Sequence, residues 1–161
     1  MDILQYAINM ELDGEKYYRE QAEKNKGNEL HGLCNWLAEE EKRHAGILEN
    51  KINKVTYRLI DSDLFLSFPN IYSDAKDIET EGQRDSNQLA FYRIAADTEK
   101  NSIDLYEKFL KEAKEDEKEI FQYLIKQEKQ HYEVFEELSR ILTNAEQWIE
   151  SPEFGRREEE Y

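Results

Sequence analysis

The feature that most constrains this chain is an internal repeat of one helical pattern. In each copy a glutamate is followed seven residues later by a tyrosine, and about 30 residues after that glutamate comes the motif Glu-x-x-His. The copies are Glu11, Tyr18 and Glu41-Lys42-Arg43-His44, then Glu99, Tyr106 and Glu128-Lys129-Gln130-His131. The spacings between the two glutamates are 30 and 29 residues. This near-equality predicts two copies of one helical hairpin, each carrying two carboxylates and one imidazole.

Four long segments have the 3.6-residue periodicity of amphipathic helices. They cover about residues 3–26, 29–53, 86–114 and 116–145. The first and second segments, and the third and fourth, are separated by short turns, which make the two members of each pair antiparallel neighbours. Residues 54–85 form a much longer connection, rich in aromatic residues and without a sustained helical period. We therefore predict an all-α fold, a four-helix bundle of two antiparallel helical hairpins joined by a long crossover.

This bundle accounts for residues 1–145 as one domain, and we expect residues 146–161 to form a C-terminal tail. The acidic run Glu158–Glu160 is expected to be solvated. Two apolar stretches, Trp148-Ile149 and Phe154, have two interpretations: they anchor the tail to the bundle or to a second subunit. A homodimer is the expected assembly.

Composition narrows the partners. The 37 acidic residues outnumber the 22 basic ones, so the net charge of −15 would repel a phosphate backbone, and we expect no nucleic-acid partner. No apolar stretch approaches the roughly 18 to 20 residues that span a bilayer, and the start lacks a basic secretory signal. We expect a cytoplasmic protein with no membrane association. The single cysteine, Cys34, can form neither an internal disulfide nor a four-cysteine metal centre, and we interpret it as a small buried hydrophobic residue.

Each long segment places one acid of the repeat on the stripe where core residues fall. Buried carboxylates are costly unless they are compensated, and these stripes carry no lysine or arginine. Two divalent cations would balance four carboxylates. The predicted metal ligands are Glu11, Glu41, His44, Glu99, Glu128 and His131. The alternative is a bundle without metal, in which Glu41→Leu would stabilise the fold and leave the metal content unchanged.

Other polar residues have less definite roles. Tyr18 and Tyr106 either donate hydrogen bonds to metal-bound carboxylates or fill core space. His31 is interpreted as a surface or packing histidine because it has no matching partner. Four residues are assigned to solvated or flanking faces: Glu15, Tyr17, Glu39 and Glu40.

The chain resembles the rubrerythrin-like branch of the ferritin-like superfamily. The resemblance rests on Met10–Tyr18, Leu37–Ala45, Asp97–Tyr106 and Gln127–His131, and extends over about residues 2–142. It implies a ferritin-like bundle with two iron ions, which Glu41 and Glu128 bridge. It makes terminal ligands of Glu11, Glu99, His44 and His131. Two features depart from the family pattern: the four-cysteine rubredoxin domain is absent, and Ser102 stands where a further glutamate is usual.

The resemblance implies a non-haem di-iron oxidoreductase that reduces hydrogen peroxide or dioxygen in oxidative-stress defence. Its electrons would come from an external donor, a rubredoxin-like protein or a flavoprotein. The alternative function is iron binding and ferroxidase activity for iron sequestration, and a third is hydroxylation of an organic substrate. Manganese, alone or paired with iron, would satisfy much the same ligands.

Overall fold

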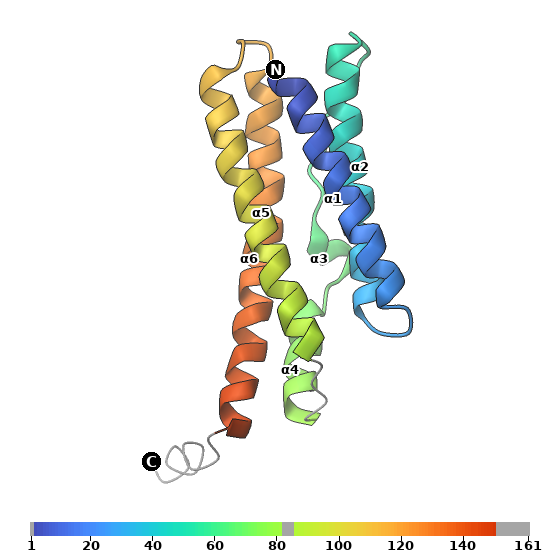
Figure 1. Cartoon of the computed structure of the whole chain (residues 1–161), viewed down its shortest axis with the longest axis vertical. Helices are drawn as coiled ribbons and strands as arrows, with labels where there is room; N and C mark the ends of the chain where they lie inside the picture. Colours follow the sequence, from blue (N-terminus) through green and yellow to red (C-terminus); the bar gives the residue numbers. More distant parts are fainter. Residues whose placement is uncertain (1, 82–85, 151–161) are drawn as a thin grey trace. The chain divides into compact units, whose positions relative to one another are not determined.

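A computed structural model describes residues 2–81 and 86–150 of the chain. Within these ranges the secondary structure consists of helices, and no β-strand is present. Figure 1 shows the helices α1 (Ile3–Lys24), α2 (Leu30–Ile52), α3 (Leu64–Ser67), α4 (Ile71–Glu81), α5 (Ser86–Glu112) and α6 (Lys118–Glu150). The prediction of an all-α helical bundle is confirmed.

The described residues form two compact units, each of which combines segments distant in the sequence. The first unit contains residues 2–62 and 105–126, and the second contains residues 63–81, 86–104 and 127–150. Helices α5 and α6 each contribute one part to each unit. The two units are described separately below.

In the first unit, α1 and α2 form the first predicted hairpin and lie side by side (Figure 1). Helix α1 ends where the Asn25 side chain donates to the Gln21 carbonyl at 2.7 Å and Gly27 adopts a φ of 94°. That positive φ is accessible to glycine without steric cost, so the predicted stop near Gly27 is confirmed. His31 then ties the two helices together, because its Nδ1 lies 2.7 Å from the Ala22 carbonyl oxygen. It is thus a packing histidine.

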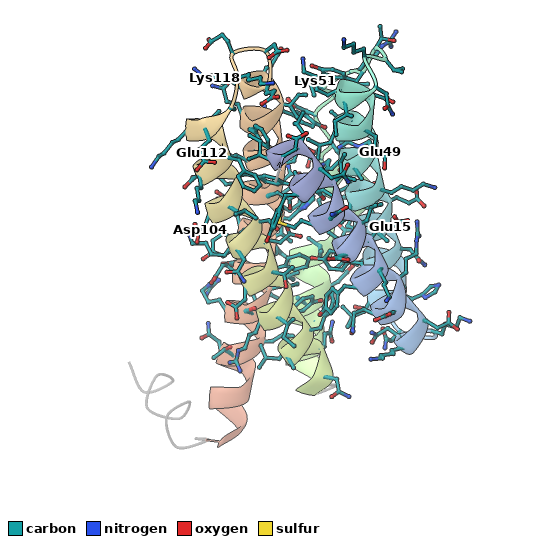
Figure 2. The ribbon with its side chains drawn as sticks, turned by 45° about the horizontal axis from the view of Figure 1, so that its top comes forward. Glu15, Glu49, Lys51, Asp104, Glu112 and Lys118 are labelled. Atoms are coloured by element: carbon teal, nitrogen blue, oxygen red, sulfur yellow. The ribbon has the colours of Figure 1, made fainter. Side chains whose placement is uncertain are left out.

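One hydrophobic core joins the four helical segments of the first unit. Core residues are Leu4, Ala7 and Ile8 from α1, Ile47 and Leu48 from α2, Tyr106 and Phe109 from α5, and Ile120, Phe121, Leu124 and Ile125 from α6. The Phe121 ring lies 6.0 Å from that of Tyr106 and 5.9 Å from that of Phe109. Charged side chains such as Glu49 and Glu112 are exposed to solvent instead (Figure 2). This separation is the one that amphipathic helices predict.

In the second unit, the remaining parts of α5 and α6 pack on one another as antiparallel neighbours. The ring of Phe135 on α6 contacts those of Phe91 and Tyr92 on α5, at centroid distances of 6.0 and 6.2 Å. Further along, Arg93 donates to the Thr143 hydroxyl at 3.0 Å. Glu99 of α5 lies beside His131 of α6, whereas Phe91 lies beside Phe135, so the residue number falls on α5 as it rises on α6. The second predicted hairpin is therefore confirmed.

The crossover contains two helices, α3 and α4, although its sequence has no sustained helical period. Helix α4 extends over three turns, with Ala75 buried and Tyr72 half-buried, and the Tyr72 ring contacts Phe65 of α3 at 5.5 Å. Its 11 residues are too few for a sustained sequence period, and so short a helix depends on tertiary packing for its stability. The lack of a sustained helical period in residues 54–85 therefore did not reveal this helix.

The C-terminal end differs as well. Helix α6 continues to Glu150, five residues past the predicted boundary at residue 145. Residues 151–161, and the side chains of Trp148, Ile149 and Phe154 that were expected to anchor the tail, lie outside what the structure describes. Among the described helices, none is long and apolar enough to cross a membrane.

Candidate metal centre

All six predicted metal ligands are buried, although four of them are acids. The exposed fractions are 2% for Glu11, 6% for Glu41, 0% for His44, 1% for Glu99, 1% for Glu128 and 0% for His131. Their positions follow from helix periodicity, since each occupies a core position of its helix. Such burial is unusual for carboxylates and calls for compensation within the fold.

In the first unit, Glu11 of α1 meets Glu41 and His44 of α2, and we call these three residues the first triad. One ligand atom from each lies within 4.8 Å of the others. The His44 Nδ1 atom is 3.6 Å from Glu11 Oε2, too long for a strong hydrogen bond and suitable for two ligands of a common cation. Glu41 and His44 reach the same space because they lie three residues apart on one face of α2.

Gly14, one turn after Glu11, leaves room for the Glu41 carboxylate. A Cβ atom added to Gly14 would lie 3.3 Å from Cδ of Glu41 and 3.4 Å from its Oε2. Any larger side chain would displace this carboxylate. The glycine therefore allows α1 and the Glu41 side chain to approach closely.

In the second unit, Glu99 of α5 meets Glu128 and His131 of α6, and we call these the second triad. Their ligand atoms also lie within 4.8 Å of one another. His131 Nδ1 is 3.7 Å from a Glu99 oxygen and 3.6 Å from a Glu128 oxygen. In both triads the Nδ1 atom is the histidine nitrogen that faces the carboxylates.

Without metal, two members of the second triad have raised pKa values. Burial raises the pKa of Glu99 well above its usual value, and the neighbouring Glu128 raises it further. Burial alone would lower the pKa of His131, but its contacts with Glu128 and Glu99 outweigh that effect and raise the pKa to about 10. A metal ion would have to displace the proton of His131, because it binds neutral imidazole.

Tyr106 contacts one of the predicted ligands. Its hydroxyl donates a hydrogen bond to Glu11 Oε1, so it orients a carboxylate of the first triad. Tyr18 is completely buried and packs edge-on against Tyr17, with the ring centroids 5.3 Å apart.

The donors present suit a divalent transition metal. Within the part of the chain that the structure describes, the buried Glu11 Oε2 atom has no hydrogen-bond partner, and a bound cation would satisfy it. Carboxylate and imidazole together suit iron, manganese and zinc, while a calcium or magnesium site would use oxygen ligands throughout. Each triad supplies two carboxylates and one imidazole, so the residues present fit a transition-metal centre.

Sequence reasoning missed one buried acid beside the first triad. The side chain of Glu40, assigned above to a solvated or flanking face, is buried, with 8% of the residue exposed. It binds Arg43, which in turn binds Tyr123. The spacing of three residues between Glu40 and Arg43 is a signal for their pairing, but it does not indicate burial. Glu39, by contrast, is exposed as expected.

Cys34 is buried and forms no disulfide, as the sequence predicts. Burial raises the pKa of its thiol to about 12. The thiol therefore stays protonated at neutral pH, which makes it a poor nucleophile and metal ligand. It takes no part in the candidate metal centre.

Comparison with known proteins is consistent with this geometry. The family model of rubrerythrin matches residues 2–139, a span that includes both triads. No curated protein and no solved structure gives a significant match. Rubrerythrins are di-iron proteins, generally related to oxidative stress, and their bundle is ferritin-like. Because the match covers most of the chain, the protein belongs to the rubrerythrin family.

Proposed function

We propose that the two triads together bind two iron ions, with Glu41 and Glu128 as bridging ligands. Glu11, Glu99, His44 and His131 then serve as terminal ligands. Three observations support this: the ligand set occurs twice, all of its members are buried, and the family is di-iron. Two divalent ions also balance the charge of four buried carboxylates.

The proposed activity is reduction of hydrogen peroxide or dioxygen in oxidative-stress defence. When bound, a pair of ferrous ions supplies two electrons, which match the reduction of peroxide to water. The observation that carries this proposal is the repeated buried triad, because six protein ligands leave coordination positions open on two metals. Electrons to restore the ferrous state would come from an external rubredoxin-like protein or flavoprotein.

The chain's own residues bury the proposed ligands and orient one of them. Tyr106 orients Glu11 through its hydrogen bond. On the α5 side, the Ser102 hydroxyl donates to the Thr98 carbonyl at 3.2 Å and so is satisfied within its own helix. Ser102 thus adds no carboxylate to the centre, in contrast to the further glutamate usual at this position in the family. The proposed ligand set is therefore symmetric, with one terminal glutamate in each triad.

The decisive experiment loads metal-free protein with Fe(II) under anaerobic conditions, measures its stoichiometry, and mixes it with peroxide or dioxygen. We expect two irons per chain, oxidised much faster by peroxide than by dioxygen. Faster oxidation by dioxygen would favour an oxidase or ferroxidase. Failure to bind two metals would overturn the di-iron proposal.

Iron oxidation for sequestration is the second candidate, favoured by the net charge of −15, which would attract cations. This function requires a store for the oxidised iron, as in the cages of ferritins. Light scattering separates the two candidates, because a dimer is expected for the peroxidase and an assembly of a dozen or more chains for a ferritin-like store.

A further inference from the structure

A buried charged network lies behind His44 in the first unit. Glu40 and Arg43, three residues apart on α2, form a bidentate ion pair, with Arg43 Nη2 2.8 Å from Glu40 Oε2 and Arg43 Nε 3.4 Å from Oε1. Arg43 thereby compensates the charge of the Glu40 side chain, which is only 10% exposed. The fork geometry also fixes the direction in which the carboxylate points.

Arg43 is itself held from its other side. Its Nη1 group donates to the Tyr123 hydroxyl and, at 3.3 Å, to the carbonyl of Ile60. The Tyr123 hydroxyl donates to the same carbonyl at 2.6 Å. The network therefore joins α2, α6 and the crossover, and it depends on tertiary contacts for its position.

Glu40 and the first triad face opposite nitrogens of the His44 ring. The Nδ1 atom lies 3.6 Å from Glu11 Oε2, while the Nε2 atom lies 4.0 Å from Glu40 Oε2. The ring edge also meets Tyr123, with centroids 6.2 Å apart at 84°. A separation of 4.0 Å is longer than a direct hydrogen bond, but a charge acts strongly over it in a buried site.

The second repeat has neutral residues at both corresponding positions. Gln127 replaces Glu40, and Gln130 replaces Arg43. Gln130 also holds the crossover, since it accepts from the Leu64 amide at 3.4 Å and donates to Asp63 at 3.3 Å. In both repeats the residue directly before the histidine contacts the crossover. Only the first repeat has a carboxylate four residues before the histidine.

We propose that Glu40 is a positioning residue for His44, and that it makes the first triad the tighter of the two iron sites. This inference rests on the proposed di-iron function. A carboxylate behind a metal-bound imidazole fixes the ring and increases its electron donation, and loss of such a partner costs about 10- to 100-fold in metal affinity. At the corresponding position of the second repeat, the amide of Gln127 carries no charge.

The test is a stepwise anaerobic titration of metal-free protein with Co(II). Calorimetry measures each binding step, and NMR detects the paramagnetically shifted imidazole N–H resonances. Wild-type protein should bind two ions in two distinguishable steps. Glu40→Gln, which keeps the shape of the side chain, should weaken the tighter step about 10- to 100-fold and shift one imidazole resonance. Gln127→Glu should strengthen the weaker step.

Glu39→Gln is the matched control, since it removes the same charge from the adjacent, exposed position of the same helix. It should leave both binding steps and both resonances unchanged. Thermal unfolding of all variants detects any general destabilisation. Recovery of the tighter step in Glu40→Asp would support a positioning role, because a merely structural defect would not be restored by a shorter acid.

Three outcomes would overturn the inference. Equal affinities in the wild-type protein would show that the sites are equivalent while leaving the di-iron function intact. A lower melting temperature in Glu40→Gln with both binding steps unchanged would make Glu40 merely structural. Absence of any Co(II) or Fe(II) binding by wild-type protein would remove the proposed function itself, and the inference with it.

Discussion

The two triads have the same ligands but different surroundings. The first has Gly14 against the Glu41 carboxylate and the charged pair Glu40–Arg43 behind its histidine. In the second repeat Ser102 takes the place of the glycine, and the corresponding pair is uncharged. The internal repeat therefore preserves the residues that would touch metal more closely than the residues that support them. Two metal sites with the same ligands can differ in affinity because their supports differ.

The largest effect is expected from the two proposed bridging residues. Glu41→Leu and Glu128→Leu should each abolish the binding of both metals, because a bridging ligand serves both ions. The metal-free proteins should be more stable than wild type by about 1 to 4 kcal/mol, since a buried charge is replaced by a core residue. Metal analysis and thermal unfolding measure both effects. Retention of two metals by either variant would contradict the bridging assignment.

The next effect is a dependence on pH that originates in the second triad. The pKa values of Glu99 and His131 are raised, so metal binding should release protons and strengthen by about tenfold per pH unit for each proton released. Calorimetry in buffers of different ionisation enthalpy counts these protons. A pH-independent affinity between pH 6 and 8 would contradict the protonated metal-free state.

The same pKa shifts affect the stability of the metal-free protein. Metal affinity should rise with pH, whereas this stability should fall. The pKa of His131 is near its usual value of 6.5 in the unfolded chain and is raised to about 10 in the folded chain. The folded chain therefore keeps a proton that the unfolded chain has released, and the free energy of unfolding should fall as pH rises from about 6.5 to 10. Denaturant titrations across this range measure the trend, and His131→Gln should reduce it.

The repeated tyrosines compare the two halves of the repeat directly. Tyr106→Phe removes the hydrogen bond to Glu11 and should weaken metal binding by about tenfold, the value of one hydrogen bond to a charged group. Tyr18→Phe is the matched change in the other copy. Equal effects would mean that both hydroxyls orient ligands, whereas an effect of Tyr106→Phe alone would leave Tyr18 as a packing residue.

The smallest effect is expected at the position one turn after each terminal glutamate. Gly14→Ala should raise metal-free stability by up to about 1 kcal/mol through helix propensity, but weaken metal binding a few-fold because the new Cβ displaces Glu41. Ser102→Ala should change both quantities little, since its hydroxyl bonds only within its own helix in the contacts described here. Equal metal affinity in Gly14→Ala and wild type would show that Glu41 can shift without cost.

Much of the candidate site could be predicted because its signals are local. Helix periodicity places Glu41 and His44 on one face, and an acid on a core stripe is conspicuous against leucine and alanine. The helix α4 could not be predicted with the same assurance, because its three turns depend on the packing of Tyr72 and Ala75. Glu40 was misassigned for a related reason: an acid followed by an arginine is usually a solvated pair, and its burial depends on Tyr123, 80 residues from Arg43 in the sequence.

The sequence by itself determined the two hairpins, the all-α class and the six candidate ligands, because spacing along a helix decides which side chains share a face. Only the tertiary structure decided what surrounds those ligands: the Tyr106 hydroxyl on Glu11, the Gly14 contact with Glu41 and the charged network behind His44. These contacts join residues from different helices and from the crossover. Their strength depends on burial, which raises the cost of an uncompensated charge and which no local pattern in the sequence records.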